Sequence, residues 1–589
     1  MEPACNNHSN FSNMTKSCFH QNYPTLCMGF VIVILSIFLT KTGYSQGTTT
    51  QSQHNEQVVI IGSVDPSINQ SYKINLSPEK PAMPEANKTF DFKPINKYFY
   101  TPVTFKPIKP ASIRAGKPGD IYNNFVKVGF GSRLSPYVEF FHSQSHKGKF
   151  RFDAHLKHIS TFGKVKGYSD APSSSSLAEL GFSKFSRYHT FTIDGGYRYN
   201  TNRYYLPDES NNSIPDADLL KQAYNLANLN ILFVSHYKNN EKLHHTIGLN
   251  SYYYFNKYKT SEMSTDLTFD LHKSFHVTDM LEYQNLGIEG GVSYYGNSDS
   301  LTDRTDLYIN ATPYYKASYG IFRFKAGVNL AYLKADSVSK FKIYPDVKVD
   351  VNLLPEYLQL YVGIDGGLKK NSFRSLSEEN PFISSIIPDR WTNDKIGVYG
   401  GLKGNISKQV GFNVNVRWSA FEDDYFYHNT YPSLTLPIVP SNELNEFNVV
   451  CDSGSRFTFD AQISYDLSSQ LNLFASYQYN SYTLRTYQQP MGKLLSQFKV
   501  GGSYIIKGRF KPWLEVDYIG KRWANIAKES MAPLELSGFT DINIGMEYYY
   551  DKHFSGFIKA TNLLNNSYQY YHLHPNYGLE VMIGISYKF

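Results

Sequence analysis

The last eleven residues of the chain alternate between an apolar set and a mostly polar set without a break. The segment Leu579–Phe589 has an apolar residue at every second position and ends on an aromatic residue, Phe589. Side chains of a β-strand point to opposite faces at successive positions, so one face of this segment is apolar and the other is mostly polar. A strand of this form is typical of the closing strand of a bacterial outer-membrane barrel, which faces lipid on one side and water on the other. The C-terminus therefore predicts a membrane-embedded β-barrel.

The same alternation recurs upstream. Clear examples are Phe322–Tyr332, Phe412–Ser419 and Phe457–Tyr465, and no segment after position 121 has a convincing helical period. We predict about 22 strands over residues 121–589, with Glu446–Leu467 as one long strand bent at Asp452–Gly454. Open sheet edges in hydrocarbon would leave backbone groups without hydrogen bonds, so the sheet is expected to close into an antiparallel transmembrane barrel.

An even number of strands places both ends of the barrel in the periplasm, and the predicted loops agree with this parity. The connections assigned to the outside are long, namely 161–176, 200–226, 368–393, 423–445, 520–538 and 564–577. The connections assigned to the inside are short, namely 239–242, 353–355, 404–408, 507–509 and 551–553.

Composition agrees with a wall that faces both lipid and water. Aromatic residues make up 16% of the chain and charged residues 19%, while the mean hydropathy is only −0.40. A soluble β-sandwich can also be rich in tyrosine, so composition alone leaves both classes open, and the strand pattern favours the barrel. The net charge of +7 is spread thinly and forms no basic block, which gives no indication of nucleic-acid binding.

Residues 1–45 are predicted to be a signal peptide. The apolar run Leu26–Thr40 is shorter than the roughly 20 residues that a membrane-spanning helix needs, and small residues around Ser45 suit a cleavage site. Met14 is a candidate for the true start. Cleavage would remove Cys5, Cys18 and Cys27 and leave Cys451 alone, so no intramolecular disulfide is expected in the mature chain. The predicted location is the outer membrane of a Gram-negative cell.

Residues 46–120 contain nine of the 27 prolines and are mostly polar. Proline lacks a backbone donor and fixes φ, so we predict an extended, irregular segment that lies in the periplasm or inside the barrel.

The C-terminal third carries a family resemblance. Its motifs are Phe557–Asn565, Tyr568, the turn Pro575–Gly578 and the closing strand to Phe589, and the segment Leu376–Phe382 is similar to a loop of the same group. With these motifs the chain resembles the TonB-dependent receptors of the outer membrane, in the style of the Bacteroidota. The resemblance covers the barrel and implies transport of a solute across the outer membrane. It also implies that Tyr587 and Phe589 serve as the signal for the barrel assembly machinery.

Receptors of this family have an N-terminal plug domain and a short segment that pairs with TonB. The segment Val58, Val59, Ile60 and Ile61 resembles the strand near that junction, and extended chain of this kind can add to a sheet edge of a partner. The alternative is a β-prone stretch in a tether. Residues 46–120 are rich in proline where a plug would be a compact domain, so the chain resembles a receptor barrel without its plug. The lumen is then expected to be blocked by residues 46–120 or by a separate protein.

We find no phosphate-binding loop, no paired-cysteine metal spacing and no catalytic triad in a recognisable context, so neither an enzyme nor a cofactor is predicted. Alternation alone selects candidate lumen-lining residues: Asn413, Asn415, Arg417, Asp460, Gln462 and Glu547. His572 and His574 share a face in the last external loop, where a ligand or metal contact is one interpretation and a solvated loop is the other, favoured one. Trp418 and Trp513 are expected in the interfacial girdle.

Two functional hypotheses remain open. The first is a transport-class barrel, similar to a TonB-dependent receptor, that passes or helps to pass a solute. The second is a non-transporting platform in an outer-membrane assembly, whose N-terminal segment docks a periplasmic protein. Lipid is the surrounding partner in both.

Overall fold

The computed structural model describes residues 122–144, 148–165, 167, 168, 170–205, 220–239, 241–276, 278–336, 338–386, 390–429, 445–468, 470–525 and 533–589. The predicted signal peptide, the proline-rich segment and Val58–Ile61 lie outside these residues.

Twenty-two antiparallel strands form one sheet that closes on itself. The first eleven are β1 (Asn124–Gly131), β2 (Ser135–Ser143), β3 (Phe150–Thr161), β4 (Ser173–Phe185), β5 (His189–Arg203), β6 (Lys221–Ser235), β7 (His244–Asn256), β8 (Ser261–Ser274), β9 (Tyr283–Ser298), β10 (Asp303–Tyr319) and β11 (Phe322–Ala335). The others are β12 (Val338–Leu354), β13 (Leu358–Asn371), β14 (Arg390–Ser407), β15 (Val410–Asn429), β16 (Phe447–Ser468), β17 (Leu471–Leu484), β18 (Ser496–Tyr504), β19 (Phe510–Ile519), β22 (Phe539–Tyr549), β23 (Phe554–Thr561) and β26 (Glu580–Lys588).

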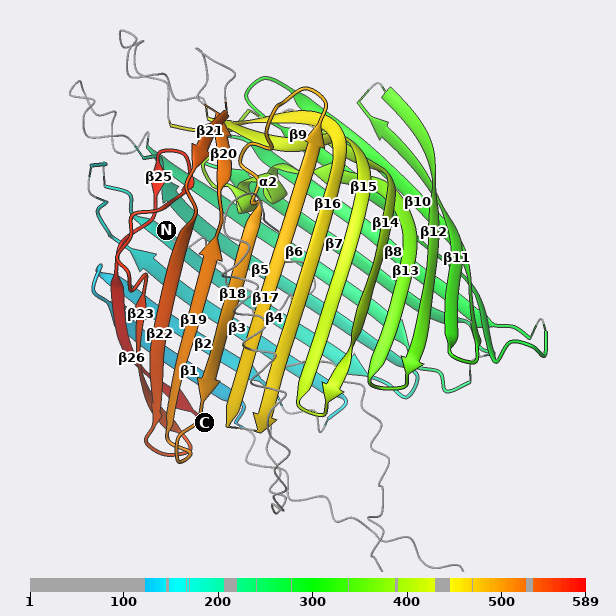
Figure 1. The fold of residues 1–589 in the computed structure, drawn as a ribbon, viewed down its shortest axis with the longest axis horizontal. Coiled ribbons are helices and arrows are strands. Elements are labelled where there is room, and N and C mark those ends of the chain that lie inside the picture. Colours follow the sequence, from blue (N-terminus) through cyan, green and yellow to red (C-terminus); the bar gives the residue numbers. More distant parts are fainter. Residues whose placement is uncertain are drawn as a thin grey trace, which may run out of the picture. The chain divides into compact units, whose positions relative to one another are not determined.

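Each wall strand pairs with its neighbour along the chain, and the last strand closes the ring. Strand β26 pairs with β1 from Phe125↔Lys588 to Gly131↔Met582, and the Asn124 backbone N–H donates to the Phe589 carbonyl at 2.9 Å. Two short hairpins stand outside this ring, β20 (Arg522–Asn525) with β21 (Pro533–Leu536), and β24 (Gln569–Tyr571) with β25 (His574–Pro575). Figure 1 shows the tilted wall strands, with β26 beside β1. The predicted fold class and strand number are confirmed.

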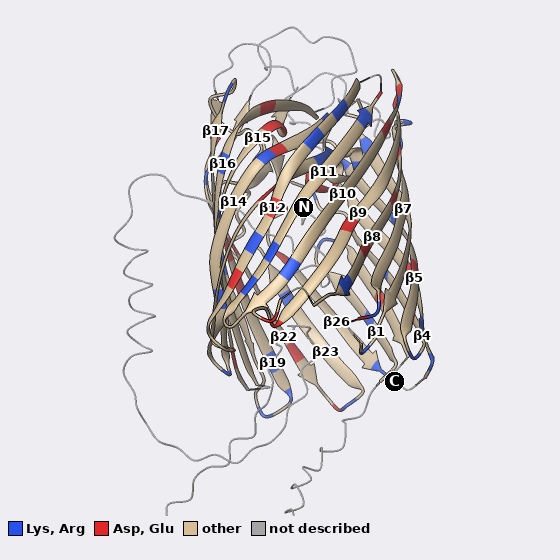
Figure 2. Cartoon of the chain, turned by 90° about the vertical axis from the view of Figure 1, so that its right-hand side faces the viewer, with Lys and Arg blue, Asp and Glu red and all other residues tan. Residues whose placement is uncertain are grey.

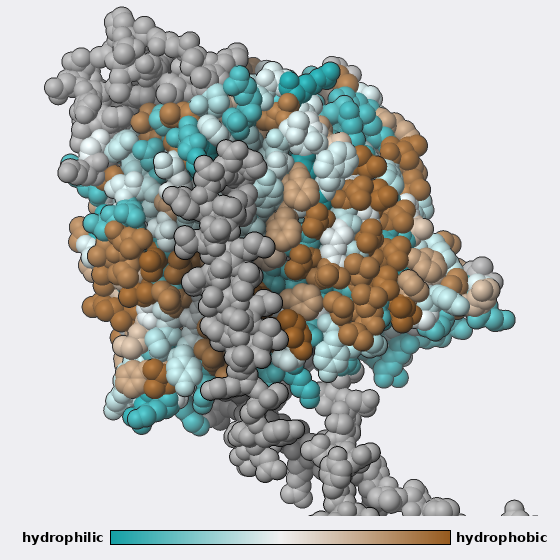
Figure 3. Space-filling view, in the orientation of Figure 1, coloured by the Kyte–Doolittle hydropathy of each residue, from teal (hydrophilic) through white to brown (hydrophobic). Residues whose placement is uncertain are grey.

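The closing strand shows how the sequence pattern becomes two faces. Ile583 and Ile585 are 60% and 52% exposed, whereas Met582 before them and Ser586 after them are buried. On the side shown in Figure 3, apolar residues gather along the wall and hydrophilic residues gather at both ends. A closed sheet with an apolar exterior satisfies its backbone groups internally and is stable in hydrocarbon, so the barrel spans a membrane.

The loops differ in length between the two ends, as predicted. All the predicted outside connections join strands at the end opposite the termini, and the predicted inside connections lie at the end that holds Asn124 and Phe589. Strand β16 is the predicted long strand. Its irregularity is a bulge in the neighbouring β15, where the register shifts between Phe421 and Asp424 opposite Gly454 and Asp452, and Asp423 has φ 56°.

The connection between β13 and β14 contains one short helix, α2 (Phe373–Glu379), which the sequence pattern did not indicate. Ser372 caps its N-terminus, because its side chain accepts a hydrogen bond from the Ser375 backbone N–H at 3.0 Å. Pro381, just beyond Asn380, cannot continue the helix. Among the described residues, no helix is long and apolar enough to cross a membrane.

Loops and strand ends at the end opposite the termini pack into a layer that we call the cap. Its buried core consists of Val165, Ala171, Tyr204, Tyr205, Leu220, Tyr224, Leu226, Tyr254, Phe373, Leu376, Phe382, Ile383, Tyr427, Phe447, Val449 and Tyr577. Each apolar side chain buried in this way stabilises the layer by about 1.5–3 kcal/mol. In Figure 1, α2 lies toward that end of the barrel.

Candidate functional site: a charged cavity on the inner wall

The candidate lumen residues on β15 and β16 lie side by side. Asn413 is the register partner of Gln462, and Asn415 is the partner of Asp460. Val416, next to Asn415, is 38% exposed on the outer face, so the polar side chains face inward. Tyr361 Oη on β13 donates to Asn415 Oδ1 at 3.3 Å, which adds a third strand to this polar surface.

Glu547 lies elsewhere on the wall, on β22. Its carboxylate accepts hydrogen bonds from Tyr549 Oη at 3.0 Å and from Ser555 Oγ at 2.8 Å. The neighbouring Met546 is exposed on the outer face. Glu547 therefore faces the lumen but is not part of the surface formed by β15 and β16.

Arg417 forms the central ion pair of the inner wall. Its Nη1 and Nη2 lie 2.9 and 2.5 Å from the two carboxylate oxygens of Asp365 on β13. The two residues meet across β14, where Gly397 has no side chain, and a Cβ at Gly397 would lie only 2.3 Å from Arg417 Nη2. Glycine is thus required here for a close approach of two side chains from strands that are not neighbours.

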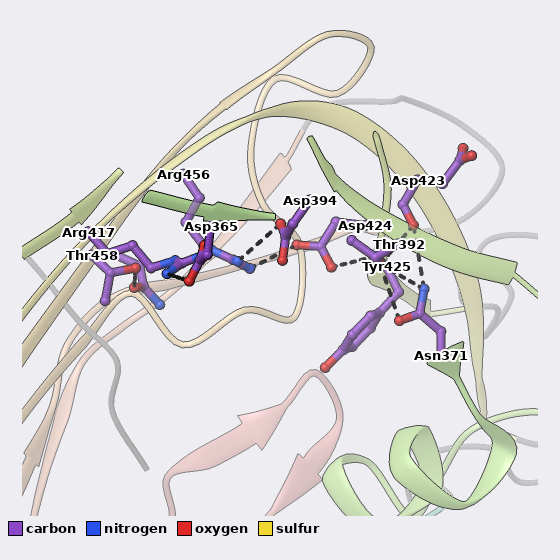
Figure 4. Close-up of polar contacts among 11 residues, drawn as sticks. Asp365, Asn371, Thr392, Asp394, Arg417, Asp423, Asp424, Tyr425, Arg456 and Thr458 are labelled. Carbon is purple, nitrogen blue, oxygen red and sulfur yellow. Dashed lines mark hydrogen bonds and ion pairs between the residues drawn. The ribbon is translucent and has the colours of Figure 1, made fainter. Parts of the chain in front are cut away.

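A second guanidinium extends this network toward the cap. Arg456 on β16 lies 3.3 Å from Asp424 and 3.7 Å from Asp394. Figure 4 shows Arg456 directed toward these two carboxylates, beside the pair of Arg417 and Asp365. Arginine and aspartate therefore alternate along the inner faces of β13 to β16.

A lysine on the other side continues the pattern. Lys325 Nζ on β11 lies 2.6 Å from Glu289 on β9 and 2.6 Å from Asp346 on β12. Two carboxylates thus share one ammonium group, which leaves hydrogen-bond capacity on their remaining oxygens.

Several members of these ion pairs line an open cavity of about 560 Å³ on the inner wall. It is lined by Thr268, Phe269, Glu289, Gly290, Asn310, Thr312, Asn329, Asp346, Asp365, Gly366, Gly367, Leu368, Lys369, Asp394 and Arg417. Charges of both signs, amides and hydroxyls suit a polar solute that offers several donors and acceptors. Among the described residues, no group of three or more His, Cys, Asp and Glu side chains is arranged to hold a metal ion.

Alternation did not single out most of the cavity residues. Lys325, which pairs with two cavity carboxylates, is on the predicted polar face of Phe322–Tyr332. The cavity residues Glu289, Asp346, Asp365 and Asp394 were not selected. The sequence does carry an indication of these residues, because the polar faces of successive strands bear opposite charges. Pairing them required the register of strands that are two or three positions apart in the barrel.

The histidine-containing part of the last external loop packs into the cap, which corrects the expectation of solvated histidines. The His574 ring is 4.0 Å from the Phe382 ring, centre to centre, and also packs on Tyr205 and Phe447. Burial lowers the pKa of His574 to about 3 and also lowers the pKa of His572. Neutral His574 contacts the His572 carbonyl through Nδ1 at 2.9 Å, so both residues are parts of the packed cap.

The two tryptophans of the expected girdle have different positions. Trp418 is 44% exposed on the outer face, whereas Trp513 packs over Gly545 on the inner face, where a Cβ on Gly545 would lie 2.5 Å from its ring. The exposed neighbour Leu514 confirms this alternation, so the expectation for Trp513 was wrong. Tyr587 and Phe589 lie at the outer face of the terminal strand end, and their part in assembly stays a prediction.

No protein-family model and no curated protein sequence matches this chain. Solved structures do match. The FrpB iron transporter from Neisseria meningitidis (F3-3 variant) has 12% identity and a TM-score of 0.58 over 80% of this chain and 82% of that chain. The pyoverdine outer membrane receptor FpvA from Pseudomonas aeruginosa PAO1 has 11% identity and a TM-score of 0.59 over 80% and 79%.

The siderophore receptor PirA from Acinetobacter baumannii gives 9% identity and a TM-score of 0.59 over 80% of this chain and 81% of that chain. At these identities the likeness establishes the fold. The barrel has the 22-stranded fold of the TonB-dependent receptors, which confirms the fold that the sequence resemblance implied.

Proposed function

We propose that the protein is a transport barrel of the outer membrane that passes a polar solute through its lumen. The observation that carries this proposal is the cavity of about 560 Å³, whose wall alternates carboxylates with Arg417 and Lys369. Similar barrels include an iron transporter and a siderophore receptor by name, which supports a transport role. The solute class that fits the wall is a polar molecule with donors, acceptors and no strong net charge.

Two barriers in series control passage in this proposal. The first is the cap, which packs at the end opposite the termini. The second is residues 46–120 inside the lumen or, in the alternative, a separate protein. Val58–Ile61 would pair with TonB by strand addition, which would couple the removal of the second barrier to an energy source.

Ion selectivity in a planar bilayer tests whether the cavity lies on the conduction path. We would use the chain that lacks residues 46–120 and has residues 372–389 replaced by a short turn, so that both barriers are absent, and compare it with its Asp365→Asn variant. Asp365→Asn is expected to shift the reversal potential toward anion preference, because it removes a lumen charge beside Arg417.

The matched control is Asp551→Asn. Asp551 lies in the turn between β22 and β23, at the end of the barrel that holds the termini. An equal shift for both variants, or none for Asp365→Asn, would refute the cavity as the path. A stoichiometric periplasmic protein that co-purifies with a barrel that never conducts would instead support the assembly-platform hypothesis.

A further inference from the structure

The barrel wall has an interruption between β12 and β13. Pairing of these strands runs from Leu354↔Leu358 to Val347↔Ile364 and ends there. Beyond this point the described residues 338–346 pair only with β11, and the described residues 365–371 pair only with β14. We call this stretch the seam. Strands β11, β12 and β14 face the viewer in Figure 2.

The β12 edge of the seam is apolar on its outer face. On β12, outward-facing apolar residues continue from Val351 and Val347 up to Ile343 and Phe341, and the last two are each 61% exposed. At about 3.3 Å per residue and a tilt of roughly 45°, this run covers most of the thickness of a bilayer core. The strands therefore separate within this apolar run, in the part that is farther from the termini.

Side chains close the seam in place of backbone hydrogen bonds. Tyr344 Oη donates to Asn393 Oδ1 at 2.7 Å, and the ring of Tyr344 occupies the space left by Gly366. Asp306 on β10 accepts from Lys370 Nζ at 2.5 Å and from Trp391 Nε1 at 2.7 Å. The Trp391 ring packs on the inward-facing rings of Tyr308 and Tyr295, at 5.1 and 5.6 Å between centres. These side-chain contacts can open without breaking backbone hydrogen bonds between strands.

The inner side of the seam is the charged cavity. Asp346 of β12 and Asp365, Gly366, Leu368 and Lys369 of β13 line both the seam and the cavity. An apolar outer edge therefore leads directly into a polar interior. This arrangement is amphipathic across the thickness of the wall, and it matches a molecule with an apolar chain and a polar head.

The sequence of the free edge disfavours a peptide strand as the occupant. Pro345 lies at the point where the strands separate and has no backbone donor. Lys340 and Lys342 place charges along the same edge, and both devices prevent the addition of a further strand.

We propose that the seam between β12 and β13 is a lateral entrance through which an amphiphile of the outer leaflet reaches the cavity, with its acyl chain between the strands and its polar head among Asp346, Asp365 and Lys369. This inference deepens the proposed function, because it names the class of ligand and its route. It also accounts for access to the cavity below a packed cap.

Tryptophan quenching tests the entrance, because the chain has four tryptophans with useful positions. Three single-tryptophan variants would retain Trp391, Trp513 or Trp418, with the others replaced by Phe. They would be reconstituted in vesicles of phosphatidylethanolamine and phosphatidylglycerol whose acyl chains are brominated near the carboxyl end. Trp418 on the outer face reports contact with lipid, and Trp513 on the inner face of the paired wall reports its absence.

If the seam admits acyl chains, quenching of Trp391 is expected to be several-fold larger than that of Trp513 and to approach that of Trp418. Asp306→Asn, which weakens the contacts to Lys370 and Trp391, is expected to increase the quenching of Trp391 further. Quenching of Trp391 that is no larger than that of Trp513 would overturn the proposal.

A second measurement does not depend on the tryptophan replacements. A photoreactive benzoylphenylalanine at Lys369, which lines the cavity beside the seam, is expected to cross-link to radiolabelled phosphatidylethanolamine, the zwitterionic lipid of the same vesicles. The control is the same group at Asn413, on the inner face of the paired wall. Equal labelling at both positions would also overturn the proposal. Both readouts detect lipid rather than conduction, so they can succeed or fail separately from the transport test.

Discussion

At the scale of single residues, the inner wall depends on positions where a side chain is missing. Gly397 allows Arg417 and Asp365 to meet across β14, since an added Cβ would lie 2.3 Å from the guanidinium and 2.7 Å from the carboxylate. We expect Gly397→Ala to separate this pair and to lower the free energy of unfolding by about 1–3 kcal/mol. The measurement is urea unfolding of the barrel in detergent, followed by the gel shift of folded barrels.

Gly195→Ala is the matched control for this experiment. Gly195 is also inside a wall strand, but the nearest atom to an added Cβ is 3.6 Å away, which is ordinary contact. Its unfolding midpoint should stay close to that of the parent chain. Equal losses for the two glycines would show that strand propensity, and not the ion pair, determines the effect.

A second residue-scale prediction concerns the pH dependence of the cap. His574 has an ordinary pKa of 6.5 when the chain is unfolded and about 3 when it is buried. Below pH 6.5 the unfolded state binds a proton that the folded state rejects, so stability decreases as the pH falls and is unaffected above pH 7. At pH 5 the loss is about 2 kcal/mol.

Hydrogen exchange of residues 568–579 at pH 7.5 and pH 5 measures this effect. His574→Gln removes the titration and should reduce the difference between the two pH values. His572 also has a lowered pKa and lies in the same loop, so a remaining difference is expected to disappear in the double variant. A loop that exchanges equally at both pH values in the parent chain would refute the prediction.

At the scale of elements, helix α2 shows what the sequence could and could not predict. The strands follow from a local period of two, and their number, the loop parity and the long β16 were all predicted from alternation. Helix α2 is too short for a helical period to be visible, and its stability comes from contacts with distant strands. The charged cavity was missed for the same reason, since Lys325 and Glu289 are partners only because β9 and β11 curve toward one lumen.

Glu262 is a buried contact between α2 and the wall. Its buried carboxylate accepts the Phe373 backbone N–H at 2.7 Å and the Tyr252 hydroxyl at 2.5 Å. We expect Glu262→Ala to leave the first turn of α2 without this acceptor and to destabilise the cap locally by about 1–3 kcal/mol. Hydrogen exchange of residues 372–386 should accelerate accordingly.

The control is Glu378→Ala in the same helix. Glu378 pairs with Arg374 and Arg198 at 3.3 and 3.4 Å, but its side chain is partly exposed, and exposed pairs contribute at most about 1 kcal/mol. Little change in exchange is expected. If Glu378→Ala accelerated exchange as much as Glu262→Ala, the buried anchor would not be the cause.

At the scale of the whole molecule, the wall and its contents have separable roles. In the described part of the chain, the wall is a closed ring with a seam between β12 and β13, and the cap is built from loops at one end. A ring of 22 strands encloses a lumen wide enough to need a block. The sequence predicted the wall almost completely because lipid and water impose alternation on every strand. The cap follows no such rule, because its tyrosines and histidines meet only after the loops fold inward.

If the cap and residues 46–120 are two barriers in series, the conductance of deletion variants can be predicted. Asn371 and Arg390 are register partners, so residues 372–389 can be replaced by a short Gly-Ser turn that closes the hairpin between β13 and β14. This change removes α2 and opens the cap. We expect neither this variant nor the chain without residues 46–120 to conduct strongly in a planar bilayer, because one barrier remains in each. The double variant is expected to show a large, steady conductance, since the bare ring then has no block.

A large conductance after loss of the cap alone would assign the block in the cell to a separate protein. A double variant that is inserted and folded, as shown by its gel shift, but does not conduct would contradict both barriers.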